Sequence, residues 1–124
     1  NVMGPFLCSK HFIHYVDPEK GGLIINMSSL AGIRANPNSP LYCTSKAALN
    51  MLSDGMALQL KENNIRVTTL NPGATDTDFW GQRKVAREKF MKADDVADVV
   101  LFVLKSNDYI VFHEINFESF LNFK

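Results

Sequence analysis

The sequence has few cysteines, no excess of charge of either sign and no long apolar run, and each of these absences argues against a class of protein. It carries two cysteines, Cys8 and Cys43, and 13 basic residues balance 13 acidic ones. Two cysteines without metal or redox spacing build no disulfide framework, so we expect a reducing, cytoplasmic compartment. Balanced charge with no basic stripe argues against a nucleic-acid partner. No apolar run approaches the length of a membrane span, so no membrane partner is predicted.

The chain also lacks an initiator methionine and the features of a signal peptide. It begins Asn1-Val2-Met3-Gly4-Pro5, with neither a basic start nor a small-residue cleavage site. We therefore expect that it begins inside a longer reading frame or after processing.

Apolar patterning predicts helices that alternate with strands. Apolar side chains recur at helical spacing over 41–63, and helices are also predicted over 96–105 and over 2–15, where the apolar residues are at mixed spacing. Continuous apolar or β-branched runs predict three strands: 23–27, 66–70 and 109–117. The alternation predicts an α/β fold with a parallel sheet flanked by helices. Between these elements, residues 28–40 are expected to form a loop and residues 74–92 a mobile segment.

Three parallel strands amount to only half of a doubly wound sheet. The strand at 23–27 would be left as an unpaired apolar edge, which invites aggregation. We therefore predict that residues 1–124 form a single partial domain. Its missing neighbours would lie upstream in the native chain or come from a partner.

Tyr42 and Lys46 stand four residues apart at the start of the predicted helix 41–63, so they share one helical face. A cation close to a phenol favours the phenolate, which makes a tyrosine usable as a general acid–base near neutral pH. Taken alone, the spacing is more often that of an ordinary surface pair. The function depends on what else lies beside it.

Two further features follow predicted strands at the edge where open α/β sheets bind ligands. The Ser29 hydroxyl could hydrogen-bond a substrate carbonyl there. The Pro72-Gly73 turn lets the backbone pass close to a flat ligand, and Thr75 and Thr77 could hydrogen-bond an amide. Each feature alone is also typical of a plain strand-ending turn.

The order of these features resembles the short-chain dehydrogenase/reductase family. The matching stretches run over residues 24–32, with the serine pair, 41–49, with Tyr42 and Lys46, and 67–77, with the Asn-Pro-Gly turn. The resemblance covers the chain up to Lys105. It implies the C-terminal half of a Rossmann-like fold, a parallel sheet with flanking helices that lacks the N-terminal βαβ cofactor half.

The resemblance also implies roles for the catalytic residues. Tyr42 would exchange a proton with the substrate oxygen, and Ser29 would orient that oxygen and stabilise its developing charge. Lys46 would hold the nicotinamide ribose and tune Tyr42. Asn1, at the spacing expected of a catalytic asparagine, would anchor a water in a proton relay, although a capping or disordered asparagine is a competing interpretation.

For the cofactor, the resemblance implies NAD or NADP, with hydride transfer to or from a small carbonyl or alcohol substrate. The cofactor-binding residues would be Tyr42, Lys46, the Pro72-Gly73 turn, Thr75 and Thr77. Residues 78–92 would close over the substrate. Helices 2–15 and 41–63 would pack against a second subunit in a homodimer or tetramer.

The sequence departs from the family at both ends. It has no glycine-rich fingerprint for the cofactor's phosphates, and its tail lacks the usual two glycines. The alternative is therefore a truncated, catalytically silent relic, or an interaction or oligomerisation module that binds no dinucleotide. No metal is predicted, because His11 and His14 have no third ligand near them in the sequence.

Overall fold

The computed structural model describes all of residues 1–124. Its helices are α1 (Met3–Ile13), α2 (Pro40–Leu60) and α3 (Ala93–Lys105). Its strands are β1 (Gly22–Met27), β2 (Ile65–Pro72), β3 (Thr75–Asp76), β4 (Met91–Lys92) and β5 (Glu114–Phe117). Short 3₁₀ turns cover Leu30–Gly32, Lys61–Asn63, Asp78–Trp80 and Arg87–Lys89. None of the helices combines the length and the apolar character needed to cross a bilayer.

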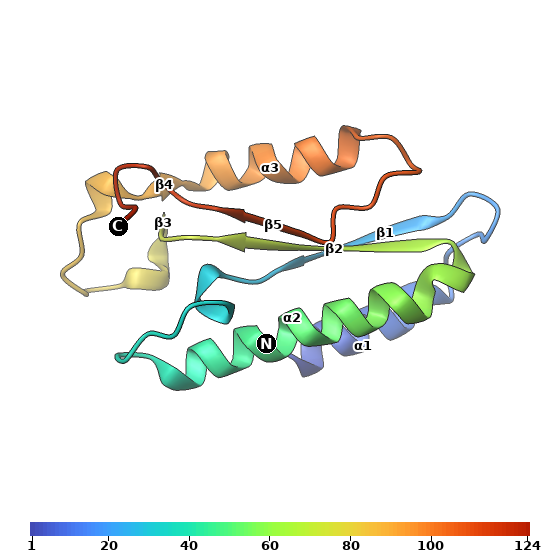
Figure 1. The fold of residues 1–124 in the computed structure, drawn as a ribbon, viewed down its shortest axis with the longest axis horizontal. Coiled ribbons are helices and arrows are strands. Elements are labelled where there is room, and N and C mark those ends of the chain that lie inside the picture. The colour runs from blue at the N-terminus through green and yellow to red at the C-terminus, as the bar shows by residue number, and fades with distance from the viewer.

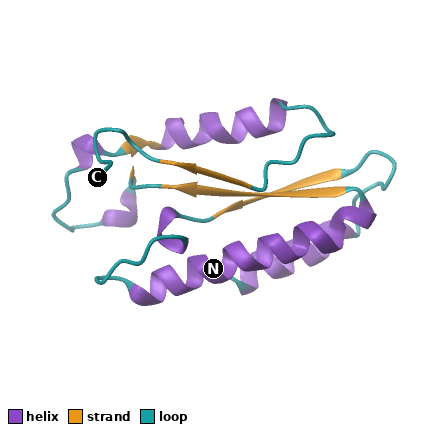
Figure 2. Ribbon diagram, in the orientation of Figure 1, coloured by secondary structure: helices purple, strands orange, loops and turns teal.

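The main sheet is parallel throughout, with the strand order β1-β2-β5, and β3 and β4 form a separate short pair. Helices α1 and α2 cover one face of the sheet, and α3 covers the other (Figure 1; Figure 2). This arrangement confirms the predicted α/β fold with a parallel sheet flanked by helices. It also confirms that β1 is an edge strand, because β1 pairs with β2 alone.

The hydrophobic core lies between α2 and the central strand. Met56 and Leu60 of α2 are buried against Ile65 and Val67 of β2, and Ile13 of α1 packs at the border of this cluster. These α2 residues recur at helical spacing, which is the stripe that the sequence shows. The core therefore fixes α2, and with it Tyr42 and Lys46, to the centre of the sheet.

The register brings the carboxyl ends of all three strands to one edge. Met27 at the end of β1 pairs with Leu70, and Pro72 at the end of β2 pairs with Phe117. Residues that follow these ends, including Ser29, therefore share one edge, the usual ligand edge of a parallel sheet.

Three details differ from the sequence expectations. The strand expected to stop before the Asn-Pro-Gly turn runs on through Pro72, and the Gly73 amide then donates to the Phe117 carbonyl at 2.8 Å. The last strand covers only 114–117, because the chain before it turns, with the Ile110 amide donating to the Asn107 carbonyl at 3.0 Å. A continuous apolar run such as that of β1 is typical of a strand covered on both faces, yet most of the residues of β1 are only half-buried.

Candidate active site

Helix α2 presents Tyr42 and Lys46 at its first turns, as their spacing predicts. The helix begins at Pro40, where a proline costs no hydrogen bond. The Lys46 Nζ lies 5.8 Å from the centre of the Tyr42 ring and donates to the Met27 carbonyl at 3.2 Å. Lys46 therefore connects the Tyr42 ring to the carboxyl end of β1.

The Lys46 ammonium is partly withdrawn from water. Burial lowers its pKa below the ordinary value of 10.5, because desolvation disfavours the charged form. An ammonium has three hydrogen-bond donors, and the Met27 carbonyl accepts from one of them. The others remain for a ligand at this edge.

The serine pair after β1 docks directly onto α2 beside Lys46. The Ser28 hydroxyl donates to the Lys46 carbonyl at 3.3 Å, and the Ser29 Oγ accepts from the Ala31 amide at 3.1 Å. Ser29 thus caps the 3₁₀ turn that follows it, and its own hydroxyl hydrogen is left for another acceptor. The structure places Ser29 and Lys46 at the same sheet edge, as predicted.

Asn1 reaches α2 but not Lys46. It precedes α1, and its Nδ2 donates to the Ser45 Oγ at 3.1 Å. Ser45 in turn donates to the Tyr42 carbonyl at 2.8 Å. Asn1 is exposed and contacts α2 at Ser45, which directly precedes Lys46 and lies three residues after Tyr42. Its role in a proton relay stays a prediction.

The Pro72-Gly73 turn holds itself together with local hydrogen bonds. The Thr75 hydroxyl donates to the Gly73 carbonyl at 3.1 Å, and the Thr77 Oγ1 accepts from the Phe79 amide at 3.4 Å. Thr75 therefore braces the turn, whereas Thr77 keeps a hydroxyl hydrogen for a ligand. Their predicted contact with a carboxamide stays a prediction.

A row of aromatic rings joins Tyr42 to the segment 78–92, and the sequence alone did not show it. Phe79 lies 5.6 Å from the Tyr42 ring, and Trp80 lies 5.3 Å from Phe79 and 5.1 Å from Phe90. The Trp80 indole nitrogen donates to the Thr75 carbonyl at 2.9 Å. The signal in the sequence was the adjacent Phe79-Trp80 pair, but only the fold brings it against Tyr42.

Asp76, at the end of β3, forms ion pairs with two cations in the later part of the segment 78–92. Its two carboxylate oxygens each accept at 3.0 Å, one from Arg87 and one from Lys92. The hydrogen bond from Lys92, followed by that from Arg87, lowers the pKa of the Asp76 carboxyl. Asp76 therefore lies between two cations and joins β3 to the C-terminal part of the segment 78–92.

Comparison with known proteins identifies the family. A family model described as "short chain dehydrogenase" matches residues 1–88, which include Ser29, Tyr42 and Lys46. The chain belongs to the short-chain dehydrogenase family.

Curated and solved members resemble this short-chain dehydrogenase chain over most of its length. L-xylulose reductase from Caenorhabditis elegans is 36% identical over 86% of this chain and 48% of its own, and D-erythrulose reductase from Gallus gallus is 38% identical over 67% and 39%. An alcohol dehydrogenase from Thermococcus sibiricus, solved in complex with 5-hydroxy-NADP, superposes with a TM-score of 0.84 at 26% identity, over 99% of this chain and 52% of its own. The chain thus spans about half the length, or less, of the relatives that it matches.

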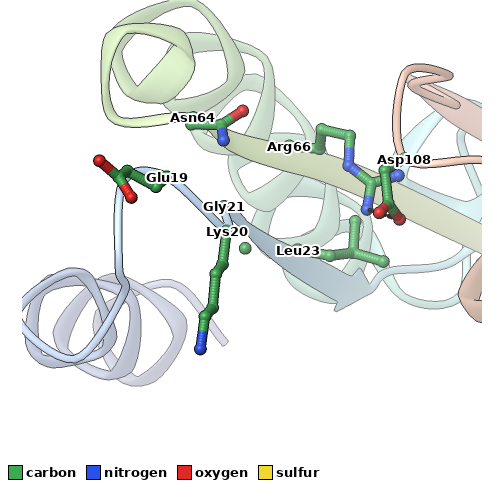
Figure 3. A pocket seen from close by; sticks show the side chains of 8 residues that line it. Glu19, Lys20, Gly21, Leu23, Asn64, Arg66 and Asp108 are labelled. Atoms are coloured by element: carbon green, nitrogen blue, oxygen red, sulfur yellow. Dashed lines mark ion pairs between the residues drawn. The ribbon is translucent and has the colours of Figure 1, made fainter.

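Two surface cavities of the short-chain dehydrogenase chain lie at the opposite, amino-terminal edge of the sheet. The first, about 390 Å³ in volume, is lined mainly by polar and charged side chains, among them Glu19, Asn64, Arg66 and Asp108 (Figure 3). The second, about 740 Å³, is more apolar and lies beside the C-terminal part of α2 and the start of β2. Neither is lined by a predicted site residue, so both are separate from the candidate active site.

Proposed function

We propose that this chain is the catalytic half of an NAD- or NADP-dependent oxidoreductase that interconverts a small carbonyl compound and its alcohol. The observation that carries the proposal is the placement of Lys46 between the Tyr42 ring and the carboxyl end of β1, where Ser29 follows. The reductase names of two relatives and the NADP analogue bound to a third support the reaction class and the cofactor.

The donor set at this edge fits the nicotinamide end of such a cofactor. Lys46 has ammonium hydrogens left for ribose hydroxyls, and Thr77 has a hydroxyl hydrogen left for the carboxamide beside the Pro72-Gly73 turn. When bound, the cofactor supplies the hydride. The chain contains no glycine-rich phosphate-binding turn, so its residues provide no comparable cradle for the adenosine end.

In this proposal the chain's own residues manage the substrate oxygen and its proton. The Tyr42 hydroxyl transfers its proton to the carbonyl oxygen during reduction and takes it back during oxidation. Ser29 donates a hydrogen bond to the same oxygen as negative charge develops on it. Lys46 favours the phenolate that Tyr42 becomes. Asn1, held by Ser45, orients a water that returns the proton from solvent.

The exposed apolar side chains of α1 and α2 support the expected assembly with a second copy. Seven large apolar residues on these helices are exposed: Met3, Phe6, Leu7, Phe12, Leu41, Met51 and Leu58. Contact between the outer faces of α1 and α2 of two copies would bury them. The same observation serves the second candidate function, a catalytically silent interaction module. Binding of the cofactor, rather than assembly, separates the two.

The proposal is tested in the product of the complete reading frame that contains this chain. We expect it to oxidise NADH or NADPH in the presence of small ketones. Tyr42→Phe should lower kcat by about 10²- to 10⁴-fold and change the cofactor Kd far less, because the ring stays in place and only the proton-donating hydroxyl is lost. Tyr109→Phe is the matched control, since Tyr109 is 85% exposed and follows α3.

Two results would contradict this reading of the chain. A stop codon or unrelated sequence upstream of Asn1 would favour the silent module. For the chain alone we expect negligible binding in an NAD(P)H fluorescence titration. Tight binding there would show that the adenosine end is held by residues assigned to other roles.

A further inference from the structure

Arg34 and Glu118 form an ion pair between two segments at the carboxyl edge of the sheet. The Arg34 Nη2 lies 2.8 Å from the Glu118 Oε1, although 84 residues separate them in the chain. Arg34 lies in the loop between β1 and α2, two residues after the 3₁₀ turn that Ser29 caps, and Glu118 directly follows β5. The Glu118 side chain is only 18% exposed, whereas Arg34 is 58% exposed. The carboxylate is therefore largely withdrawn from water, and the guanidinium is its partner.

Glu118 also sets the position of the turn after β2. A Cβ atom on Gly73 would lie 2.6 Å from the Glu118 Cβ and 3.4 Å from the Leu30 Cδ1. Gly73 therefore fits only because it has no side chain, with Glu118 on one side and the Ser29 loop on the other. The hydrogen bond from the Gly73 amide to the Phe117 carbonyl, at 2.8 Å, closes the contact.

The backbone of Arg34 is itself fixed by two contacts, one to the 3₁₀ turn before it and one to α2. Its amide donates to the Leu30 carbonyl at 2.8 Å, and the Cys43 thiol approaches its carbonyl at 3.8 Å. A shift of the Arg34 backbone would therefore move the turn that Ser29 caps. The pair thus joins the Ser29 loop to the strand end against which Gly73 packs.

We propose that the Arg34–Glu118 pair fixes the spacing between the Ser29 loop and the Pro72-Gly73 turn. In the proposed function, Ser29 would hold the substrate oxygen and the Pro72-Gly73 turn would hold the nicotinamide. The inference rests on that function, because the distance between the two then sets how substrate and cofactor meet. Arg34 and Glu118 are positioning residues, because neither is placed at the reacting atoms. A planar guanidinium on a partly buried carboxylate suits this role, since the bond is directional and charge-assisted.

Hydrogen exchange of the Gly73 amide, followed by NMR in the full chain, tests the positioning directly. Glu118→Gln and Arg34→Gln should each speed this exchange by up to about fivefold, the loosening expected from losing one such pair. The reversed pair, Arg34→Glu with Glu118→Arg, should restore the slow rate if the ion pair itself is responsible. Asp108→Asn is the matched control, because it breaks the 3.6 Å pair with Arg66, in which Asp108 is 96% exposed.

The inference is overturned if Gly73 exchange is unchanged in Glu118→Gln, or if Asp108→Asn speeds it equally. Should Arg34→Gln unfold the chain, Arg34→Lys, which keeps the charge without the planar fork, gives the same test at smaller amplitude. In the complete protein, Glu118→Gln should lower kcat with ketone, and the reversed pair should recover it. An inactive wild type would overturn the proposed function, whereas an active one with unaltered kcat in Glu118→Gln would overturn this inference alone.

Discussion

Replacing Gly32 with alanine should separate the Ser29 loop from α2. A Cβ atom at Gly32 would lie 2.9 Å from the Lys46 carbonyl carbon and 2.7 Å from the Asn50 Nδ2. The first of these neighbours is helix backbone, which cannot rotate away as a flexible side chain can. The loop would have to move by several tenths of an ångström, and that movement would carry Ser29 away from Lys46.

The expected cost follows from this geometry. Forcing one extra carbon into such a contact costs about 1–3 kcal/mol in free energy of unfolding. Gly55→Ala, in α2, is the matched control, because nothing lies within 4 Å of its added Cβ. An alanine there should stabilise the chain by about 0.5–1 kcal/mol, since glycine is a poor helix former. The same substitution is thus expected to have opposite signs at two positions.

Urea denaturation followed by circular dichroism would measure both effects. In the complete protein, Gly32→Ala should also reduce kcat by up to about 10²-fold, the price of a misplacement approaching one ångström at a reacting group. Gly55→Ala should leave kcat unchanged. A Gly32→Ala variant as stable as the wild type would refute the reasoning, because it would show that the loop does not rest on the helix backbone.

Three further outcomes are expected. Phe79→Leu should lower the free energy of unfolding by about 0.5–1.5 kcal/mol and shift the emission of Trp80, the sole tryptophan, to longer wavelength as the indole meets water; an unshifted spectrum would contradict the ring contact. The free energy of unfolding of the wild type should rise relative to that of Lys46→Met as the pH rises from the lowered pKa of folded Lys46 towards 10.5. Over that range the unfolded chain binds the Lys46 proton more readily than the folded chain does. If the stabilities of the two proteins depend on pH in the same way, the Lys46 ammonium is not buried. Asn26→Ala should cost about 1–3 kcal/mol, because it removes the buried 2.8 Å bond to the Ser53 hydroxyl, and thermal unfolding beside Ser53→Ala should show less than additive losses.

The parts of the site that depend on local geometry could be predicted from the sequence. Residues four apart on a helix must share a face, so the pairing of Tyr42 with Lys46 follows from their spacing. Residues that follow parallel strands must gather at one edge, which brings Ser29 and the Pro72-Gly73 turn together. Neither inference requires knowledge of which side chains pack against which.

The contacts between distant segments could not be predicted in the same way. Nothing near Arg34 or Glu118 in the sequence indicates that they meet, because their approach depends on the register of β5 against β2. The position of Asp76 between two cations depends likewise on the pairing of β3 with β4. The strand was predicted to begin at residue 109, because the apolar composition of 109–113 does not reveal that Ile110 closes a turn.

The purely parallel sheet has a consequence for how the molecule is made. A parallel pair has no hairpin to start from, so β1 pairs with β2 only after the whole of α2 has been added. During synthesis, β1 and α1 therefore wait for a time on the order of seconds before the central strand leaves the ribosome. Over that interval the edge of β1 that faces β2 stays unpaired, and we expect chaperones that bind extended segments to recognise it.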